Sequence, residues 1–192
     1  MKEIEVLVMI KSYDMETVLN KIQSMAKYIS QQHVLDVYYY DPLRTNLQPD
    51  KNLAIYECFR LRQKEAKNYV TYKVDKFDSS GKWLYSDESE TEVASYDNMT
   101  KIIAALGLKK LVVVDMVKYY FETREYTIAF ELVENLGAFL EVESKNTNIK
   151  DNEIEAERKK IQEFINSLGV ETTPDLGIGK PELLLKKLGW NK

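Results

Sequence analysis

The feature of this sequence that most limits its fold is a series of short runs in which apolar and polar residues alternate. Alternation with a period of two places successive side chains on opposite faces, as in a β-strand that is buried on one face. The runs cover residues 3–10, 34–40, 54–62, 69–76, 82–93, 111–122, 127–132 and 138–144. Turn-forming residues at 78–81 indicate a hairpin between two of them. We therefore expect about eight antiparallel strands.

Four other segments have apolar residues at helical spacing, and each has a start or stop signal. They are residues 14–30, 96–106, 153–168 and 181–188. The polar, turn-rich stretch 43–52 is expected to be a loop. About eight antiparallel strands, with two of these helices lying between strand runs, favour an α+β fold that is mainly antiparallel β and forms a closed or nearly closed barrel. The length of 192 residues suits a single domain over residues 1–192.

Composition excludes several classes of function. The net charge of −4 comes without any long basic run, so no nucleic-acid partner is expected. Cys58 is the only cysteine and His33 the only histidine, which excludes an internal disulfide and a cysteine-based zinc site. No apolar run approaches the length of a membrane span, and acidic residues stand where a signal peptide would be apolar. We expect a cytoplasmic protein with no membrane association.

Two of the strand-like runs each carry a pair of glutamates spaced by two residues. The pairs are Glu3 with Glu5 and Glu141 with Glu143, and each pair faces one side of its strand. A solvated strand face is the plain explanation for either pair. Phe139 shares the face of Glu141 and Glu143, however, so that face is not purely polar. Carboxylates without histidine or cysteine favour Mg²⁺ or Mn²⁺ as a bound metal.

Basic residues follow the same spacing on neighbouring runs. Arg60 and Arg62 share one face, and Lys73 lies on the next run. A guanidinium binds phosphate oxygens in a bidentate manner, whereas a lysine acts as a point charge. Surface salt bridges are the alternative explanation. A third carboxylate pair, Glu88 and Glu90 or alternatively Glu90 and Glu92, is more simply explained as surface charge.

Taken together, these segments resemble the CYTH domain of the triphosphate tunnel metalloenzymes over about residues 1–188. That family includes class IV adenylate cyclases, thiamine triphosphatases, and inorganic or RNA triphosphatases. The resemblance rests on residues 3–5, 39–44, 59–62, 71–73 and 128–143. The last of these is the most specific, because it resembles the family's segment ending in Gly-x-Phe-x-Glu-Ile-Glu.

The resemblance implies an eight-stranded tunnel in which carboxylates hold one or two Mg²⁺ or Mn²⁺ ions and basic side chains bind a triphosphate such as ATP. The implied metal ligands are Glu3, Glu5, Glu131, Glu141 and Glu143. The implied phosphate-binding residues are Arg60, Arg62 and Lys73, with Lys11 and Lys118 as further candidates. Attack by water would give hydrolysis, and attack by the substrate's 3′-hydroxyl would give cyclic AMP. No catalytic residue is assigned. A homodimer is permitted by the tyrosine-rich strands but not required.

The chain also departs from the family pattern. Positions that are basic in many members hold Leu7, Ser86, Asp115 and Val117. Lys118 is expected to point away from the tunnel unless a bulge shifts its strand. Lys180 stands where members often have tyrosine. These departures leave an alternative open: a non-catalytic module that binds triphosphates or nucleotides in a degenerate tunnel.

Overall fold

The computed structural model describes residues 2–12, 14–78 and 83–190. Within these residues, nine strands form one antiparallel sheet in the order β1-β6-β5-β4-β3-β7-β8-β9-β2. The strands are β1 (Lys2–Glu3), β2 (Glu5–Met9), β3 (Lys27–Tyr40), β4 (Glu57–Lys64), β5 (Lys67–Phe77), β6 (Trp83–Val93), β7 (Lys109–Glu122), β8 (Tyr126–Val133) and β9 (Gly137–Ser144). The helices are α1 (Met15–Gln23), α2 (Tyr96–Ala105), α3 (Ile154–Ser167) and α4 (Lys180–Leu188), with short 3₁₀ turns at Thr45–Leu47 and Asp151–Glu153.

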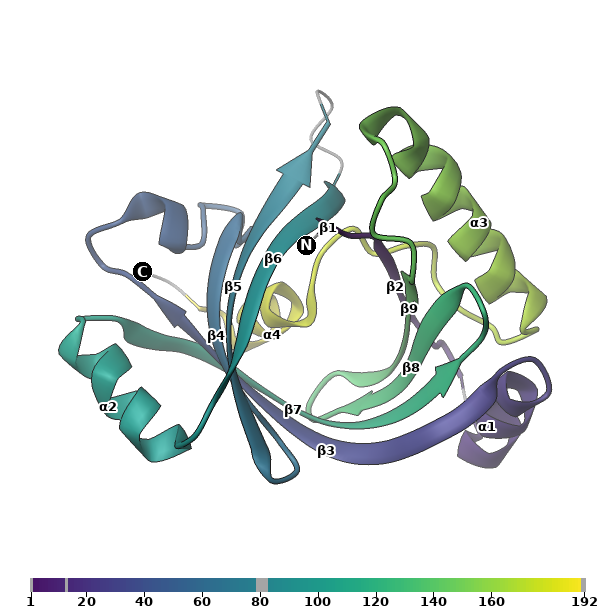
Figure 1. The fold of residues 1–192 in the computed structure, drawn as a ribbon, viewed down its shortest axis with the longest axis horizontal. Coiled ribbons are helices and arrows are strands. Elements are labelled where there is room, and N and C mark those ends of the chain that lie inside the picture. The colour runs from purple at the N-terminus through teal and green to yellow at the C-terminus, as the bar shows by residue number, and fades with distance from the viewer. Residues whose placement is uncertain (1, 13, 79–82, 191–192) are drawn as a thin grey trace.

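The two ends of the sheet are joined by a single residue. β1 pairs with β6, β2 pairs with β9, and only Ile4 separates β1 from β2. The Ser144 amide donates a hydrogen bond of 2.9 Å to the Ile4 carbonyl, which continues the pairing with β9. The sheet therefore curves into a nearly closed barrel with its edges protected (Figure 1). The expected antiparallel tunnel is confirmed, although the strand expected at 3–10 is divided in two.

Three helices cover the outside of the barrel. α1 and α3 bury Ile22 and Ile161 against outward-facing residues of β2, β8 and β9, among them Val6 and Phe130. α2 covers a second outer patch, where Ile103 packs with residues of β3 and β4. In Figure 1, α1 and α3 flank one side of the barrel and α2 flanks the other. The outer face is thus apolar where these helices cover it, which leaves the opposite face of the strands for the interior.

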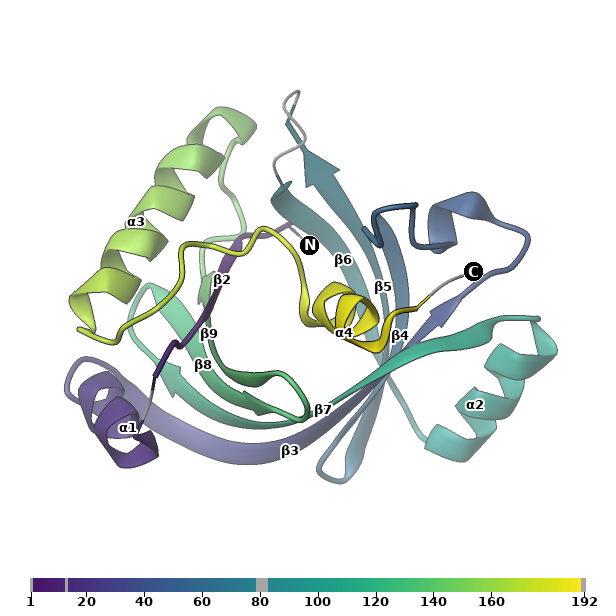
Figure 2. The same cartoon turned by 180° about the vertical axis from the view of Figure 1, so that it is seen from behind.

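The fourth helix packs against the inward faces of the strands. Leu184 and Leu185 of α4 share a buried cluster with Leu7, Val114 and other inward-facing residues. Figure 1 and Figure 2, seen from opposite sides, both place α4 within the outline of the barrel. α4 therefore fills one part of the interior and bounds the remaining space.

The helix expected over 14–30 is too long, since α1 ends at Gln23 and residues 27–30 belong to β3. Pairing of β3 with β7 starts at Lys27 and overrides the helical spacing, and Ile29 remains 47% exposed. β5 and β6 do pair as an antiparallel hairpin, but most of the turn expected at 78–81 lies outside the described residues. No helix among the described residues is long and apolar enough to cross a membrane.

Candidate functional site

The barrel encloses a cavity of about 900 Å³. It lies between the strands and the segment that leads into α4. The sequence-predicted site residues on its lining are Glu3, Glu5, Arg60, Arg62, Lys73, Lys118, Glu141 and Glu143. Glu131 lies next to the cavity and contacts Lys118. Lys11 lies elsewhere, on the surface, where its ammonium is 3.7 Å from a Glu171 carboxylate oxygen.

Strand periodicity explains why these residues meet. On β4, Cys58, Arg60 and Arg62 line the cavity, while Leu61 between them is fully buried under α2. On β9, Glu141 and Glu143 line the cavity, while Val142 packs under α1 and α3. The charged residues are therefore turned inward by the apolar residues that alternate with them.

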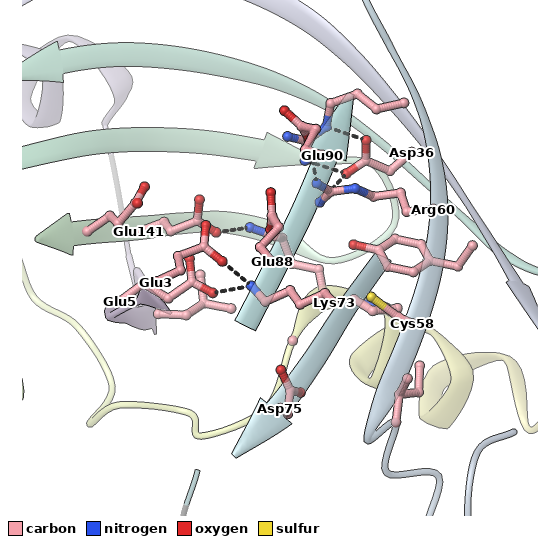
Figure 3. A pocket seen from close by; sticks show the side chains of 18 of the residues that line it. Glu3, Glu5, Asp36, Cys58, Arg60, Lys73, Asp75, Glu88, Glu90 and Glu141 are labelled. Atoms are coloured by element: carbon pink, nitrogen blue, oxygen red, sulfur yellow. Dashed lines mark hydrogen bonds and ion pairs between the residues drawn. The ribbon is translucent and has the colours of Figure 1, made fainter. Parts of the chain in front are cut away.

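The two arginines share a buried carboxylate, Asp36 of β3. The Arg62 guanidinium donates two hydrogen bonds of 2.7 Å to its two oxygens. An Arg60 nitrogen lies 3.6 Å from one of them, and Arg60 also donates to Glu90 at 3.3 Å. Burial alone would raise the pKa of Asp36, but Arg62 and Arg60 outweigh it and lower this pKa to about 2. Figure 3 shows Asp36 facing Arg60 within the cavity.

Lys73 of β5 contacts both glutamates of the Glu3/Glu5 pair. Its ammonium donates to Glu3 at 2.5 Å and to Glu5 at 3.2 Å (Figure 3). Burial alone would lower the pKa of Lys73, yet Glu5 and Glu3 raise it well above its usual range. Lys73 is therefore charged at neutral pH and partly neutralises this part of the cavity.

Glu143 is the carboxylate with the least compensation. It pairs with Glu5 across β2 and β9, and no hydrogen bond or ion pair reaches its side chain from the described residues. Burial raises the pKa of Glu143 to about 8, with Glu3, Glu5 and Glu141 adding to the effect. Burial likewise raises the pKa of Glu5 to about 7, against the attraction of Lys73. We call Glu3, Glu5 and Glu143 the glutamate triad; its one contacting lysine, Lys73, reaches Glu3 and Glu5.

Glu131 and Glu141 have a different environment, because two lysines lie between them. Lys118 is 2.5 Å from Glu131 and 3.3 Å from Glu141. Lys180 of α4 is 2.6 Å from Glu131 and 2.5 Å from Glu141. Burial alone would raise the pKa of Glu141, but Lys118 and Lys180 hold it well below its usual range.

The structure corrects the orientation expected for β7. Lys118 points into the cavity, and its pairing with β8 contains no bulge. Asp115 lies on the opposite face, where one of its carboxylate oxygens is 2.6 Å from the exposed His33 ring. The strand's inward face thus carries Lys118 rather than Asp115 and Val117, so the interior is more basic than the sequence pattern suggested.

Sequence reasoning also missed residues that the fold brings to the cavity. Asp36 shares a strand face with Tyr38, a spacing that was readable in the sequence. Lys180 stands out in the sequence only as a departure from the family pattern. Arg158 lies outside the cavity lining, in a helix rich in Lys and Glu that is typical of a solvated face, but it is buried and donates to the carbonyls of Glu5 and Leu84, at 2.8 and 3.1 Å. It also pairs with Asp175, which fixes the segment before α4.

The glutamate triad can be tested for its fit to a divalent metal. Its carboxylate oxygens, on adjoining strands, are the donor type that Mg²⁺ and Mn²⁺ prefer. Burial and, to a lesser extent, repulsion among neighbouring glutamates raise the pKa values of Glu5 and Glu143, and a bound cation would favour their charged forms. Among residues 2–12, 14–78 and 83–190, no three acidic, cysteine or histidine side chains converge into a ready-made metal site. The donors fit in chemistry, and Lys73 now occupies the space between Glu3 and Glu5.

Fold and cavity together define a nearly closed antiparallel barrel with paired charges inside it. The family model for the CYTH domain matches residues 1–175. The chain belongs to the CYTH domain family.

Known proteins with a similar sequence or fold support this membership. A protein of Methanocaldococcus jannaschii named "Putative adenylate cyclase MJ0240" is 25% identical over 168 residues, which is 87% of this chain and 90% of that protein. The solved structure of PH1819 from Pyrococcus horikoshii has a TM-score of 0.76 and 25% identity, covering 95% of this chain and 99% of that one. A Hippeastrum protein, described as a "Putative adenylyl cyclase" with a dominant triphosphatase activity, has a TM-score of 0.63 at 15% identity, covering 99% and 97%.

Proposed function

We propose that this chain binds a nucleotide or other triphosphate in the barrel cavity together with Mg²⁺ or Mn²⁺, and cleaves it as a triphosphatase or a class IV adenylate-cyclase-like enzyme. The observation that carries the proposal is the convergence of basic side chains from separate strands beside the glutamate triad. The side chains are those of Arg60, Arg62, Lys73 and Lys118. Such a set matches the charge of a triphosphate chain next to a metal ion.

Each group of residues has a distinct role in this proposal. Arg60 and Arg62 bind phosphate oxygens through their planar guanidinium groups, and Asp36 holds them in orientation. Lys73 and Lys118 contribute point charges. The glutamate triad holds the divalent ion, which when bound neutralises phosphate charge and polarises the phosphoryl group. The barrel walls keep the triphosphate in line with its attacking oxygen.

The reaction depends on which oxygen attacks. Water entering the cavity yields inorganic phosphate or pyrophosphate, whereas the 3′-hydroxyl of a nucleotide yields a cyclic nucleotide and pyrophosphate. The name of the Methanocaldococcus relative supports cyclase activity, and the dominant activity of the Hippeastrum protein supports triphosphate hydrolysis. In both cases the chain's own residues would stabilise the charge that develops on the phosphoryl oxygens.

A panel assay tests the proposal. Tripolyphosphate, thiamine triphosphate, ATP and GTP are incubated with the protein and Mg²⁺ or Mn²⁺, and released phosphate, pyrophosphate and cyclic nucleotide are quantified. We expect turnover of at least one substrate that chelator abolishes and that R60M reduces strongly. A matched control is K51M, which changes an exposed residue outside the cavity. Absence of any product from every substrate would contradict catalysis.

A non-catalytic binding module remains the second candidate, and one observation favours it. Arg60, Arg62, Lys73, Lys118 and Lys180 all already contact carboxylates around the same cavity. A phosphate group must compete with these carboxylates, which weakens its binding and its activation. Calorimetry distinguishes the candidates: tight binding of ATP or tripolyphosphate with no product supports the module.

A further inference from the structure

The arrangement of Lys118, Lys180, Glu131 and Glu141 is a closed ring of alternating charges. Lys118 contacts the Oε1 atoms of both glutamates, and Lys180 contacts their Oε2 atoms. All four carboxylate oxygens are therefore within 3.3 Å of an ammonium group. Two negative charges meet two positive charges, so the ring is neutral without any other ion.

The ring is also well shielded from water. The Glu131 side chain has no exposed surface, those of Lys118 and Lys180 are only 5% and 9% exposed, and that of Glu141, which faces the cavity, is 21% exposed. In such surroundings a charge left without a partner is costly, so the ring is stable only as a complete set. A divalent ion that bound Glu131 or Glu141 would have to displace a lysine or lie beside it.

The position of Lys180 in the chain supports a dedicated role. Lys180 is the first residue of α4, where the partial positive charge of the helix terminus repels a cation. Asp175, paired with Arg158, fixes the preceding segment. The carboxylates of Glu131 and Glu141 therefore outweigh an unfavourable local position and hold the ammonium inside the barrel.

The glutamate triad differs from the ring in its charge balance. Lys73 contacts Glu3 and Glu5 but not Glu143, and with all three carboxylates ionised the triad and this one ammonium carry an excess of two negative charges. One divalent cation would neutralise that excess. The same cavity thus has one region with excess negative charge, the triad, and one region whose charges are already balanced, the ring.

We propose that Lys180, with Lys118, supplies at Glu131 and Glu141 the positive charge that a second divalent ion would supply, so that this chain binds a single divalent ion. Glu131 and Glu141 then hold the lysines rather than metal, which narrows the metal ligands expected from the sequence to Glu3, Glu5 and Glu143. The inference rests on the proposed function only for the metal at the triad, and the number of ions is measured without turnover.

The test counts bound Mn²⁺ by calorimetry and by electron paramagnetic resonance, with and without tripolyphosphate. We expect one ion per wild-type chain. E143Q should weaken Mn²⁺ binding by at least roughly 10-fold, whereas E141Q, a matched change two residues away on the same strand, should retain the single ion. Two ions in the wild type, no ion at all, or equal losses in E141Q and E143Q would overturn the inference.

A second variant addresses Lys180 directly. K180M leaves Glu131 and Glu141 with one lysine, and we expect a second Mn²⁺ ion to bind; K186M, at an exposed position of the same helix, should still bind one. A folded K180M that binds only one ion would contradict the proposal that Lys180 supplies the charge of a second divalent ion. If K180M does not fold, the comparison of Mn²⁺ binding by E141Q and E143Q decides whether the inference holds. A wild type with one Mn²⁺ that neither binds nor cleaves triphosphate would refute the proposed function and leave this inference intact.

Discussion

Arg62 and Asp36 face each other across β3 and β4 and form a bidentate ion pair inside the cavity, with both hydrogen bonds at 2.7 Å. The guanidinium geometry that suits a phosphate is thus already satisfied by a carboxylate of the protein. The pair keeps the arginines extended toward the cavity in the absence of ligand. It also means that phosphate binding must shift or share the contacts of Arg62.

We expect D36N to be less stable than the wild type by about 3 kcal/mol, because the buried Arg62 loses its carboxylate partner and Arg60 keeps only Glu90. Tripolyphosphate should raise the melting temperature of D36N more than that of the wild type, since it supplies the missing negative charge. Thermal unfolding with and without tripolyphosphate measures both effects. D87N is the control, because Asp87 pairs with Lys76 on the exposed surface. An unchanged melting temperature in D36N would contradict a structural role for the pair.

The same pair predicts an acid transition. The pKa of Asp36 is about 2 in the folded chain, below the ordinary value of an unfolded aspartate. Its contribution to stability is therefore complete above about pH 4 and is lost as the pH falls toward 2. The difference in unfolding free energy between wild type and D36N should shrink by roughly 1 kcal/mol between pH 5 and pH 3. Urea unfolding at the two pH values measures it, and a constant difference would refute the assignment.

Glu143 predicts the opposite pH dependence in metal-free protein. Its pKa is raised to about 8, so the folded chain holds a proton that the unfolded chain releases near pH 4.5. Stability without metal should fall as the pH rises from about 4.5 to 8, and E143Q should melt at a higher temperature than the wild type at pH 8.5 in chelator. Mn²⁺ should stabilise the wild type more than it stabilises E143Q. The exposed E134Q should behave as the wild type in both conditions.

Lys73 is expected to affect phosphate and metal in opposite directions. K73M removes a charged partner of a bound phosphate and should weaken tripolyphosphate binding roughly 10-fold or more. The same change frees Glu3 and Glu5, so Mn²⁺ binding should become tighter. Calorimetry with each ligand separately measures the two effects. K76M, on the same strand but more exposed, serves as the control. Loss of Mn²⁺ binding together with phosphate binding would count against the proposed roles.

Much of this architecture was readable from the sequence because it depends on short-range periodicity. The inward direction of Arg60 and Arg62 follows from the apolar residue between them. β7 was oriented wrongly for a related reason: its run of valines is apolar on both faces, so alternation does not identify the inner one. The structure shows Val112 and Val114 buried and Val113 36% exposed.

Other features depended on contacts that no local pattern encodes. Lys180 reaches Glu131 and Glu141 only because α4 packs inside the barrel. The early end of α1 depends on the pairing of residues 27–30 with β7. Arg158 is buried by strands far away in the sequence, although its helix reads as polar. In each case a tertiary partner, rather than a propensity, determined the outcome.

The single-residue junction at Ile4 also has a consequence for how the protein folds. Lys2 and Glu3 of β1 pair with Asp87 and Ser86 of β6, and Glu5 of β2 pairs with Glu143 of β9. This short stretch therefore depends on two remote parts of the chain. During synthesis, residues 2–9 must wait until β9 has been made before all their partners exist. Closure of the ring is then a late, entropically demanding event, and we expect slow folding of the kind seen in chains dominated by non-local pairing.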